Sequence, residues 1–297
     1  SEFSATWLPV YRPSSLLTDP FDFPGYIQFS SDFSPEISIK NSGFHLEYSM
    51  RNSIMDLGIS FYHGYRNNPS IMIDTLVMDF QEMQPALLEL YRKPYLVNAS
   101  GLNLAIPFGS YIFRGEYCWM DRPGSYSKAT PNPEMSWAAE LEQSGGNATI
   151  AMGYYGKYIM DYEKTDGKLF ISGNDFPGID AILPSGAVLT PDVFDDVINR
   201  QIILLNSLYN YQVEEFYHAA YALLDIGMMN DKLGFRVPVM YNFTSGELTL
   251  LPSFEIKPSD GLSILFGSYF LHGPEKSLYE LAGPVLNSFY ARIRISF

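Results

Sequence analysis

The chain has four histidines, the side chains best suited to proton transfer near neutral pH: His45, His63, His218 and His272. A serine hydrolase needs a Ser–His pair and a third group that orients the imidazole. His45 comes closest to such a set, because Glu47 and Ser49 follow at alternate positions, on one face of a strand. Any polar strand face would show this spacing, so it is weak evidence for catalysis. No Gly-x-Ser-x-Gly, Walker or His-Glu-x-x-His motif is present.

Charged side chains recur in the middle of segments that alternate apolar and polar residues. The pore-lining candidates are Glu47, Arg51, Asp56, Arg114, Glu116, Arg236, Glu255, Arg292 and Arg294. One interpretation is a charged lumen that selects solutes electrostatically. The alternative is a set of salt bridges that brace the wall or fill a closed interior. Arg292 and Arg294 share a face, which favours a wet lumen, anionic partners or acidic cross-strand neighbours.

The alternation itself predicts the elements that position these residues. Residues 44–51 are apolar at even positions, and residues 55–62 are apolar at odd positions, which indicates a hairpin. The pattern is clearest in 233–297, where turns separate four such segments. We expect about twelve strands, within a range of ten to fourteen. Pro238 and Pro252 fall inside predicted strands, so a bulge or a shifted boundary is expected there.

Other regions do not follow the pattern. Residues 66–100 hold apolar runs without clean parity, and residues 160–200 resemble a long loop that could narrow or plug the lumen. Within that loop, Thr190 and Pro191 are typical of a helix start. Residues 201–226 could form two strands or one long strand. Residues 1–40 are assigned least well, and we treat the whole chain, 1–297, as one domain.

Composition restricts the class of protein. Hydrophobic residues make up 46% of the 297 residues and aromatic residues 15%, yet charged residues are only 18%. No run of about 18 uncharged apolar residues occurs, so a transmembrane helix is not expected. A formal net charge of −14 argues against nucleic acid as a partner. The single Cys118 excludes an internal disulfide framework and a cysteine-based metal cluster.

A soluble sandwich or barrel and a membrane barrel share this alternation, but three features favour the membrane. The apolar face is bulky across many hairpins, more than a lumen could pack. The opposite face carries charges in mid-strand, which a water-filled lumen tolerates. Aromatic residues cluster toward strand ends, as a membrane girdle requires. The predicted fold is therefore an all-β, transmembrane, antiparallel up-and-down barrel with a polar lumen, short periplasmic turns and longer extracellular loops.

The last strand resembles the C-terminal signal of Gram-negative outer-membrane barrel proteins of the porin-like kind. That signal is an amphipathic strand ending in an aromatic residue, and here its elements are Tyr290, Ile293, Ile295 and Phe297. The order of strands and turns in 233–297 also resembles porin-like barrels. The resemblance implies a bacterial outer-membrane location and recognition by the barrel-assembly machinery. It places Phe297 at the periplasmic rim and residues 272–284 in an extracellular loop.

The functional prediction is a porin-like channel for passive diffusion of small hydrophilic solutes, not an enzyme, with no cofactor, metal or catalytic residue. Outer-membrane lipid and lipopolysaccharide are the other expected partners. The alternatives are an outer-membrane lipid-modifying enzyme, a closed structural or adhesive barrel, and an uptake channel for hydrophobic substrates. The opening Ser1-Glu2-Phe3 resembles a cloning remnant, so a removed export signal would not be seen.

Overall fold

One large antiparallel sheet dominates the computed structural model, which describes residues 1–12, 25–30, 35–79, 84–124, 127–164, 191–275 and 277–295. In spatial order its strands are β1 (Glu2–Leu8), β3 (Gly43–Arg51), β4 (Asp56–Tyr65), β7 (Leu96–Phe108), β8 (Tyr111–Asp121), β9 (Glu134–Gly145), β10 (Ala148–Ile159), β11 (Phe216–Met228), β12 (Leu233–Asn242), β13 (Glu247–Leu250) with β14 (Ser253–Ser259), β15 (Leu262–His272) and β16 (Ser288–Ile295). Both β13 and β14 pair with β12 and β15, so thirteen strands fill twelve positions. This number confirms the prediction.

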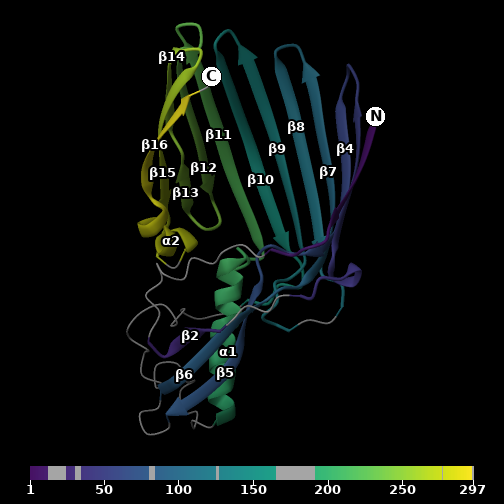
Figure 1. The fold of residues 1–297 in the computed structure, drawn as a ribbon, viewed down its shortest axis with the longest axis vertical. Coiled ribbons are helices and arrows are strands. Elements are labelled where there is room, and N and C mark those ends of the chain that lie inside the picture. The colour runs from purple at the N-terminus through teal and green to yellow at the C-terminus, as the bar shows by residue number, and fades with distance from the viewer. Residues whose placement is uncertain are drawn as a thin grey trace.

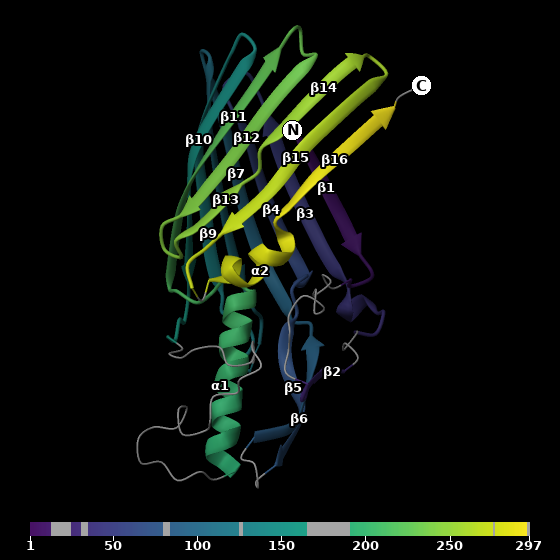
Figure 2. The ribbon, with the colours of Figure 1, turned by 90° about the vertical axis from the view of Figure 1, so that its left-hand side faces the viewer.

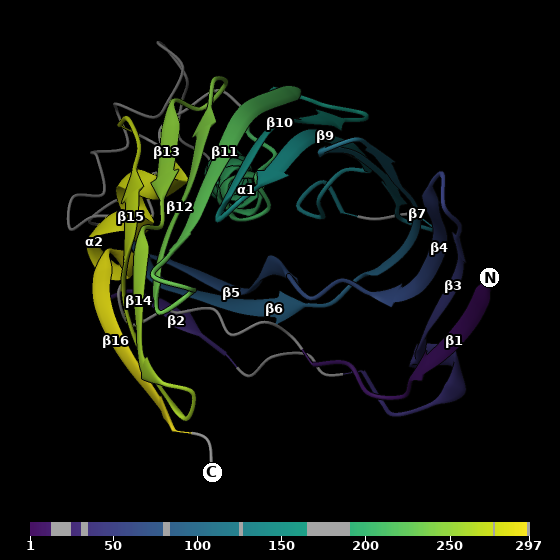
Figure 3. The ribbon, with the colours of Figure 1, turned by 90° about the horizontal axis from the view of Figure 1, so that it is seen from above.

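The sheet curls through most of a ring, with β1 and β16 as its two edges (Figure 3). Neighbouring strands are antiparallel throughout, and within the described residues β1 pairs with β3 and β16 with β15. This is the up-and-down barrel architecture predicted from the sequence. Within the N-terminal region that was assigned least well, residues 2–8 form the first strand.

The two faces of the sheet differ as a membrane barrel requires. Phe44, Leu46 and Tyr48 of β3 are 40%, 41% and 42% exposed, although strands flank them on both sides. These residues define the outer face. Residues between them, such as Glu47, lie on the inner face with their cross-strand partners. An apolar outer face around a polar inner face is the arrangement of an outer-membrane barrel.

The two ends of the barrel also differ (Figures 1 and 2). Both described chain ends lie toward one end, here called the turn end, where short turns join the strands, as between Gly145 and Ala148. The longer connections lie at the opposite end, here called the cap end. They carry α1 (Pro191–Tyr209), α2 (Leu278–Leu286), a 3-10 helix (Ile39–Asn41) and a second sheet of β2 (Ile27–Phe29), β6 (Gln84–Lys93) and β5 (Ser70–Asp79).

Helix α1 and the second sheet form a compact unit, here called the cap. Its core contains buried side chains from both parts, namely Ile71, Leu88, Leu90, Ile198 and Ile202. Burial of this many aliphatic side chains gives the cap a hydrophobic core separate from the barrel wall. Neither α1 nor α2, the two α-helices of the described chain, is long and apolar enough to cross a membrane.

The cap accounts for the regions without clear alternation. Residues 66–100 include β5 and β6, whose pairing contains register shifts near Ile73 and Val77, so their parity breaks. The interpretation of 201–226 as strands alone was wrong, because α1 continues to Tyr209 before β11 begins. The predicted loop 272–284 likewise contains most of α2. A helix does start at Pro191, but residues 165–190, including Thr190, lie outside the described residues.

The two prolines lie at one interruption of the sheet. Pro252 falls between β13 and β14. Pro238 of β12 lies beside the same break, and its carbonyl accepts a hydrogen bond from the Leu251 amide. Because the pairing changes from β13 to β14 at this level, neither ring removes a donor from a continuous ladder. The expected irregularity is therefore confirmed.

Candidate functional site

A polar group of side chains interrupts the apolar outer face near the cap end. His63 of β4 lies directly opposite Asn98 of β7 and opposite Phe44 of β3, so it shares the outer face. Its Nδ1 lies 2.7 Å from Oδ1 of Asn98. An amide oxygen only accepts hydrogen bonds, so Nδ1 carries the proton and Nε2 is the unprotonated nitrogen of the neutral ring.

Ser100 occupies the next outer position of β7, two residues beyond Asn98 and diagonal to His63. Asp121 of β8 lies opposite Asn98 on the other side. The outer face thus brings together a hydroxyl, an imidazole with a free acceptor nitrogen, and an amide that holds the imidazole. Within the described residues Ser100 makes no hydrogen bond to His63. Catalytic hydrogen bonds are often long without substrate and shorten when it binds.

The level of this group matters for what it could contact. His63 lies two residues before the cap end of β4, and Asn98 two residues after β7 begins there. At about 3.3 Å per residue, both are roughly 7 Å from the strand ends. Trp7 lies opposite Phe44 in the same row and is exposed, as expected of an interfacial aromatic residue. The group therefore lies close to the cap-end rim of the wall, in the same row as an exposed aromatic side chain.

The histidine set expected from the sequence lies elsewhere. His45, Glu47 and Ser49 do share one face of β3, but this is the inner face. Within the described residues no hydrogen bond joins these three side chains. The structure therefore gives this set no catalytic geometry.

The nine pore-lining candidates all occupy inner-face positions. Arg51 lies opposite Asp56, and Glu116 opposite Asn103 and Ala138. Arg236 approaches Asp225 at 3.9 Å, and Glu255 approaches Lys257 at 3.3 Å. Arg292 and Arg294 lie opposite Leu265 and Ser263, so the acidic neighbours considered for them are absent from that strand. That these residues line an open path remains a prediction.

Arg114 has the best-defined charge contacts on this wall. Its Nη1 lies 2.8 Å from Oε1 of Glu140 and 2.7 Å from Oε2 of Glu142. Both acids come from β9, which neighbours β8. Glu140 and Glu142 were not among the pore-lining candidates. The sequence signal for Glu142 was its parity with Glu140.

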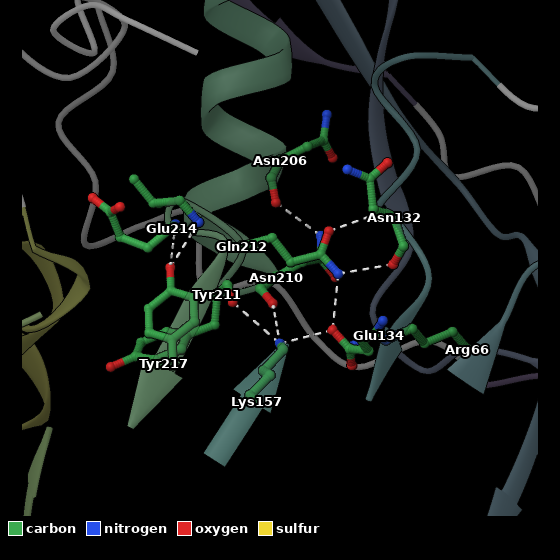
Figure 4. Close-up of polar contacts among 11 residues, drawn as sticks. Arg66, Asn132, Glu134, Lys157, Asn206, Asn210, Tyr211, Gln212, Glu214 and Tyr217 are labelled. Carbon is green, nitrogen blue, oxygen red and sulfur yellow. Dashed lines mark hydrogen bonds and ion pairs between the residues drawn. The ribbon is translucent and has the colours of Figure 1, made fainter. Parts of the chain in front are cut away.

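A buried charged cluster joins the barrel to the cap (Figure 4). Glu134, the first residue of β9, accepts from Arg66 at 3.0 Å and from the Lys157 ammonium at 2.7 Å. The Gln212 side chain donates to the same carboxylate at 2.8 Å. Glu134 is 8% and Lys157 5% exposed, so one negative and two positive charges are held away from water. Such groups are tolerated only when paired and hydrogen-bonded.

The same cluster holds the end of α1. The Lys157 ammonium donates to the carbonyl oxygens of Asn210 at 3.3 Å and Tyr211 at 3.1 Å, just beyond the helix, where a cation is favourable. Gln212 pairs with both the amide and the carbonyl of Asn132. Asn206 pairs in the same way with Ile71 of β5. Two side-chain amides thus satisfy backbone groups that no strand reaches.

Two groups of this region outside the barrel strands show the effect of burial on ionisation. Burial raises the pKa of Tyr95 to about 12. Burial by itself would lower the pKa of Arg66, but the neighbouring Tyr95 and Glu134 raise it. Arg66 therefore stays charged in the cluster. Its buried charge needs the neighbouring Glu134 carboxylate as a partner.

A second network holds the chain after α1 against β12 and β13. The Tyr211 hydroxyl donates to the carboxylate of Glu247, which is 2% exposed. Ser245 donates to the same carboxylate at 2.8 Å, and the Tyr279 amide at 3.0 Å. Burial raises the pKa of Tyr211, so its hydroxyl remains a donor. The connection between α1 and β11 is therefore held at two neighbouring residues: Tyr211 bonds to Glu247, and Gln212 bonds to Glu134.

Comparisons with known proteins find a distant likeness to solved structures. No family model matches the chain, and no curated protein matches it. It is similar to the outer membrane phospholipase A of Escherichia coli (10% identity, TM-score 0.34), covering 86% of this chain and 79% of that one. It is also similar to the Salmonella typhi outer membrane phospholipase dimer with bound calcium (9% identity, TM-score 0.34), covering 86% and 78%.

The antiparallel barrel, with its apolar outer face and polar inner face, has the architecture of an outer-membrane β-barrel. Both neighbours are enzymes, which contradicts the prediction that the chain is not an enzyme, and that prediction is dropped. At this TM-score the likeness assigns no residue of this chain to catalysis. Among the described residues no group of three or more His, Cys, Asp or Glu side chains is arranged to hold a metal ion.

Of the expected assembly signal, Ile293 and Ile295 lie on the outer face of β16 and Tyr290 on the inner face, opposite Gly267. Phe297 lies outside the described residues. Recognition of this strand by the assembly machinery remains a prediction.

Proposed function

We propose that this outer-membrane barrel hydrolyses ester bonds of membrane lipids on its outer face, at His63, Asn98 and Ser100. The observation that carries the proposal is the 2.7 Å hydrogen bond from His63 Nδ1 to Asn98 Oδ1 on a face whose exposed large side chains are mainly apolar or aromatic. A polar pair facing lipid is costly to maintain unless it has a use. This pair leaves the imidazole in the form that a general base requires.

Each side chain has a defined role in the reaction. Ser100 Oγ adds to the carbonyl carbon of the ester while its proton passes to His63 Nε2. The same proton then passes to the departing alcohol oxygen, which leaves an acyl group on Ser100. Water, deprotonated by His63, releases the fatty acid and restores the serine. Asn98 holds the ring throughout and stabilises its Nδ1 proton.

The position of the site supports lipid as the substrate class. Its outward direction gives access from the membrane and not from the inner face. Its level, near the cap end of the strands, matches the depth at which ester groups of a glycerolipid lie. Exposed aromatic residues of the neighbouring row, such as Trp7, would hold the barrel at that depth.

Incubation of the folded barrel with phosphatidylcholine in mixed micelles should release free fatty acid and lysophospholipid. His63→Ala should reduce the release to the level of protein-free micelles, because the base is gone. Mass spectrometry of the extracted lipids measures both products. If the wild-type protein gives no product, or if His63→Ala releases as much as wild type, the proposal fails.

Passage of small hydrophilic solutes is the second candidate, favoured by the charged inner face. Ion pairs such as Arg114 with Glu140 would lose hydration free energy in a dry interior, so their presence on the inner face favours a water-filled lumen. The cap lies across the opposite end from the short turns, so passage would depend on it (Figure 2). Liposome swelling in arabinose solution measures such passage. If liposomes do not swell with the wild-type protein or with Glu134→Ala, which should loosen the cap, passage of solutes is excluded.

A further inference from the structure

His218 lies within a frame of aromatic rings on the outer face, far around the wall from His63. It belongs to β11, where Gly156 of β10 lies directly opposite on one side. On the other side the chain leaving β12 passes close by, and the Phe243 amide donates to the His218 carbonyl. His218 lies two residues from the cap end of its strand, at the same depth as His63.

Three rings surround the imidazole directly. The centroid of His218 lies 5.5 Å from Phe216, 5.7 Å from Phe243 and 6.5 Å from Tyr154. All three rings are partly exposed on the outer face. These rings surround the imidazole with aromatic, largely apolar surface.

A glycine makes room for a fourth ring. A Cβ added at Gly156 would lie 2.3 Å from the Trp137 indole, so this ring covers the position that faces His218. Trp137 in turn lies 5.8 Å from Phe216. The frame is therefore a continuous aromatic surface with one polar group at its centre.

The imidazole at this centre has no polar partner. Among the described residues, the hydrogen bonds of His218 involve its backbone amide and carbonyl alone. Glu215, the nearest acid along the strand, accepts from the Tyr158 hydroxyl. A ring N–H on a lipid-facing surface is unfavourable without a partner, which favours binding of a hydrogen-bond acceptor there.

We infer that His218 and its aromatic frame bind the phosphate group of a membrane lipid. A phosphate oxygen is the strongest acceptor at this depth, and a charge-assisted hydrogen bond to imidazole is short and strong. The surrounding rings supply apolar contact for the glycerol and acyl segments. The phosphate could come from a phospholipid or from lipopolysaccharide, because the two share this chemistry.

The site is separate from the proposed hydrolysis. His218 lies on β11, whereas His63 and Ser100 lie on β4 and β7. Loss of ester hydrolysis with intact phosphate binding, or the reverse, would show which proposal fails.

Native mass spectrometry of the detergent-solubilised barrel tests the inference with three probes: phosphatidic acid, diacylglycerol and lipid A. Wild type should retain phosphatidic acid and release diacylglycerol, which lacks the phosphate. His218→Phe keeps the ring and removes the donor, so we expect about tenfold weaker retention of phosphatidic acid. Displacement by lipid A would assign the site to lipopolysaccharide, and its absence would assign the site to phospholipid.

His272→Phe is the matched control. His272 also lies at the cap end and stacks on Phe270, 6.5 Å away, but has no such frame. This variant should bind phosphatidic acid as wild type does. Gly156→Ala displaces Trp137 without touching the imidazole and should weaken binding to an intermediate degree. Equal retention of phosphatidic acid by wild type and His218→Phe, or of diacylglycerol and phosphatidic acid by wild type, would overturn the inference.

Discussion

Ser100→Ala abolishes release of fatty acid from phosphatidylcholine while the barrel stays folded. The expected loss of turnover is at least about 10³-fold, because removal of a nucleophile leaves only binding and electrostatic contributions. The substitution deletes one half-buried hydroxyl that makes no hydrogen bond within the described residues, so stability should hardly change. Fatty acid release in mixed micelles, with the heat-induced mobility shift of a folded barrel as the folding check, measures both effects.

A pair of companion variants makes this result specific. Asn98→Leu removes the acceptor of His63 Nδ1, and should reduce turnover by about 10²- to 10⁴-fold through loss of ring orientation. Ser49→Ala removes a serine of the inner face, on the same strand as His45, and should leave turnover unchanged. Were Ser49→Ala the variant that lost activity, catalysis would belong to the inner face and the outer site would be wrong.

Glu134→Ala has the largest expected effect on stability. It leaves Arg66 and Lys157 buried together without their shared carboxylate, which lies 3.0 Å and 2.7 Å from them. Removing one partner of a buried ion pair typically costs about 3–5 kcal/mol. The loss should fall on the attachment of the cap, because Lys157 also holds the end of α1. We expect faster proteolysis and faster amide exchange in 191–212, with the barrel strands still protected.

The exposed ion pair between Lys128 and Glu163 provides the control. Both side chains are 77% exposed, and surface pairs contribute little to stability. Glu163→Ala should therefore leave protection of α1 unchanged. If Glu134→Ala also leaves it unchanged, the cluster does not anchor the cap.

Alternation was sufficient to predict the barrel, because neither face of a wall strand packs into a protein core. One face contacts lipid and the other water, so parity persists within the strands of the wall. Pro252 and Pro238 were conflicts with a single continuous strand, and the break between β13 and β14 removes both.

The cap could not be predicted in the same way. Its strands β5 and β6 pack one face on α1 and contain register shifts, so no period of two is preserved. Helix α1 carries Ile198, Ile202 and Asn206 on the side that faces β5, a helical spacing visible in the sequence. The prediction assigned strands to 201–226 because a run of apolar residues alone is compatible with either a helix or a strand.

The outer site was missed for a different reason. His63 and Asn98 occupy outer positions that the alternation reserves for apolar residues, and this violation was the available signal. Their meeting depends on pairing of β4 with β7, which the sequence separates by β5 and β6. Parity assigns a face to each residue but cannot say which strands are neighbours across an insertion.

Labelling with a fluorophosphonate, which reacts only with an activated serine hydroxyl, tests the central claim most directly. Peptide mass spectrometry of the labelled wild-type barrel should place the phosphonyl group on Ser100, and the His63→Ala variant should remain unlabelled. Failure of the reagent to modify Ser100 in folded wild type, or equal labelling of the His63→Ala variant, would contradict hydrolysis at this site.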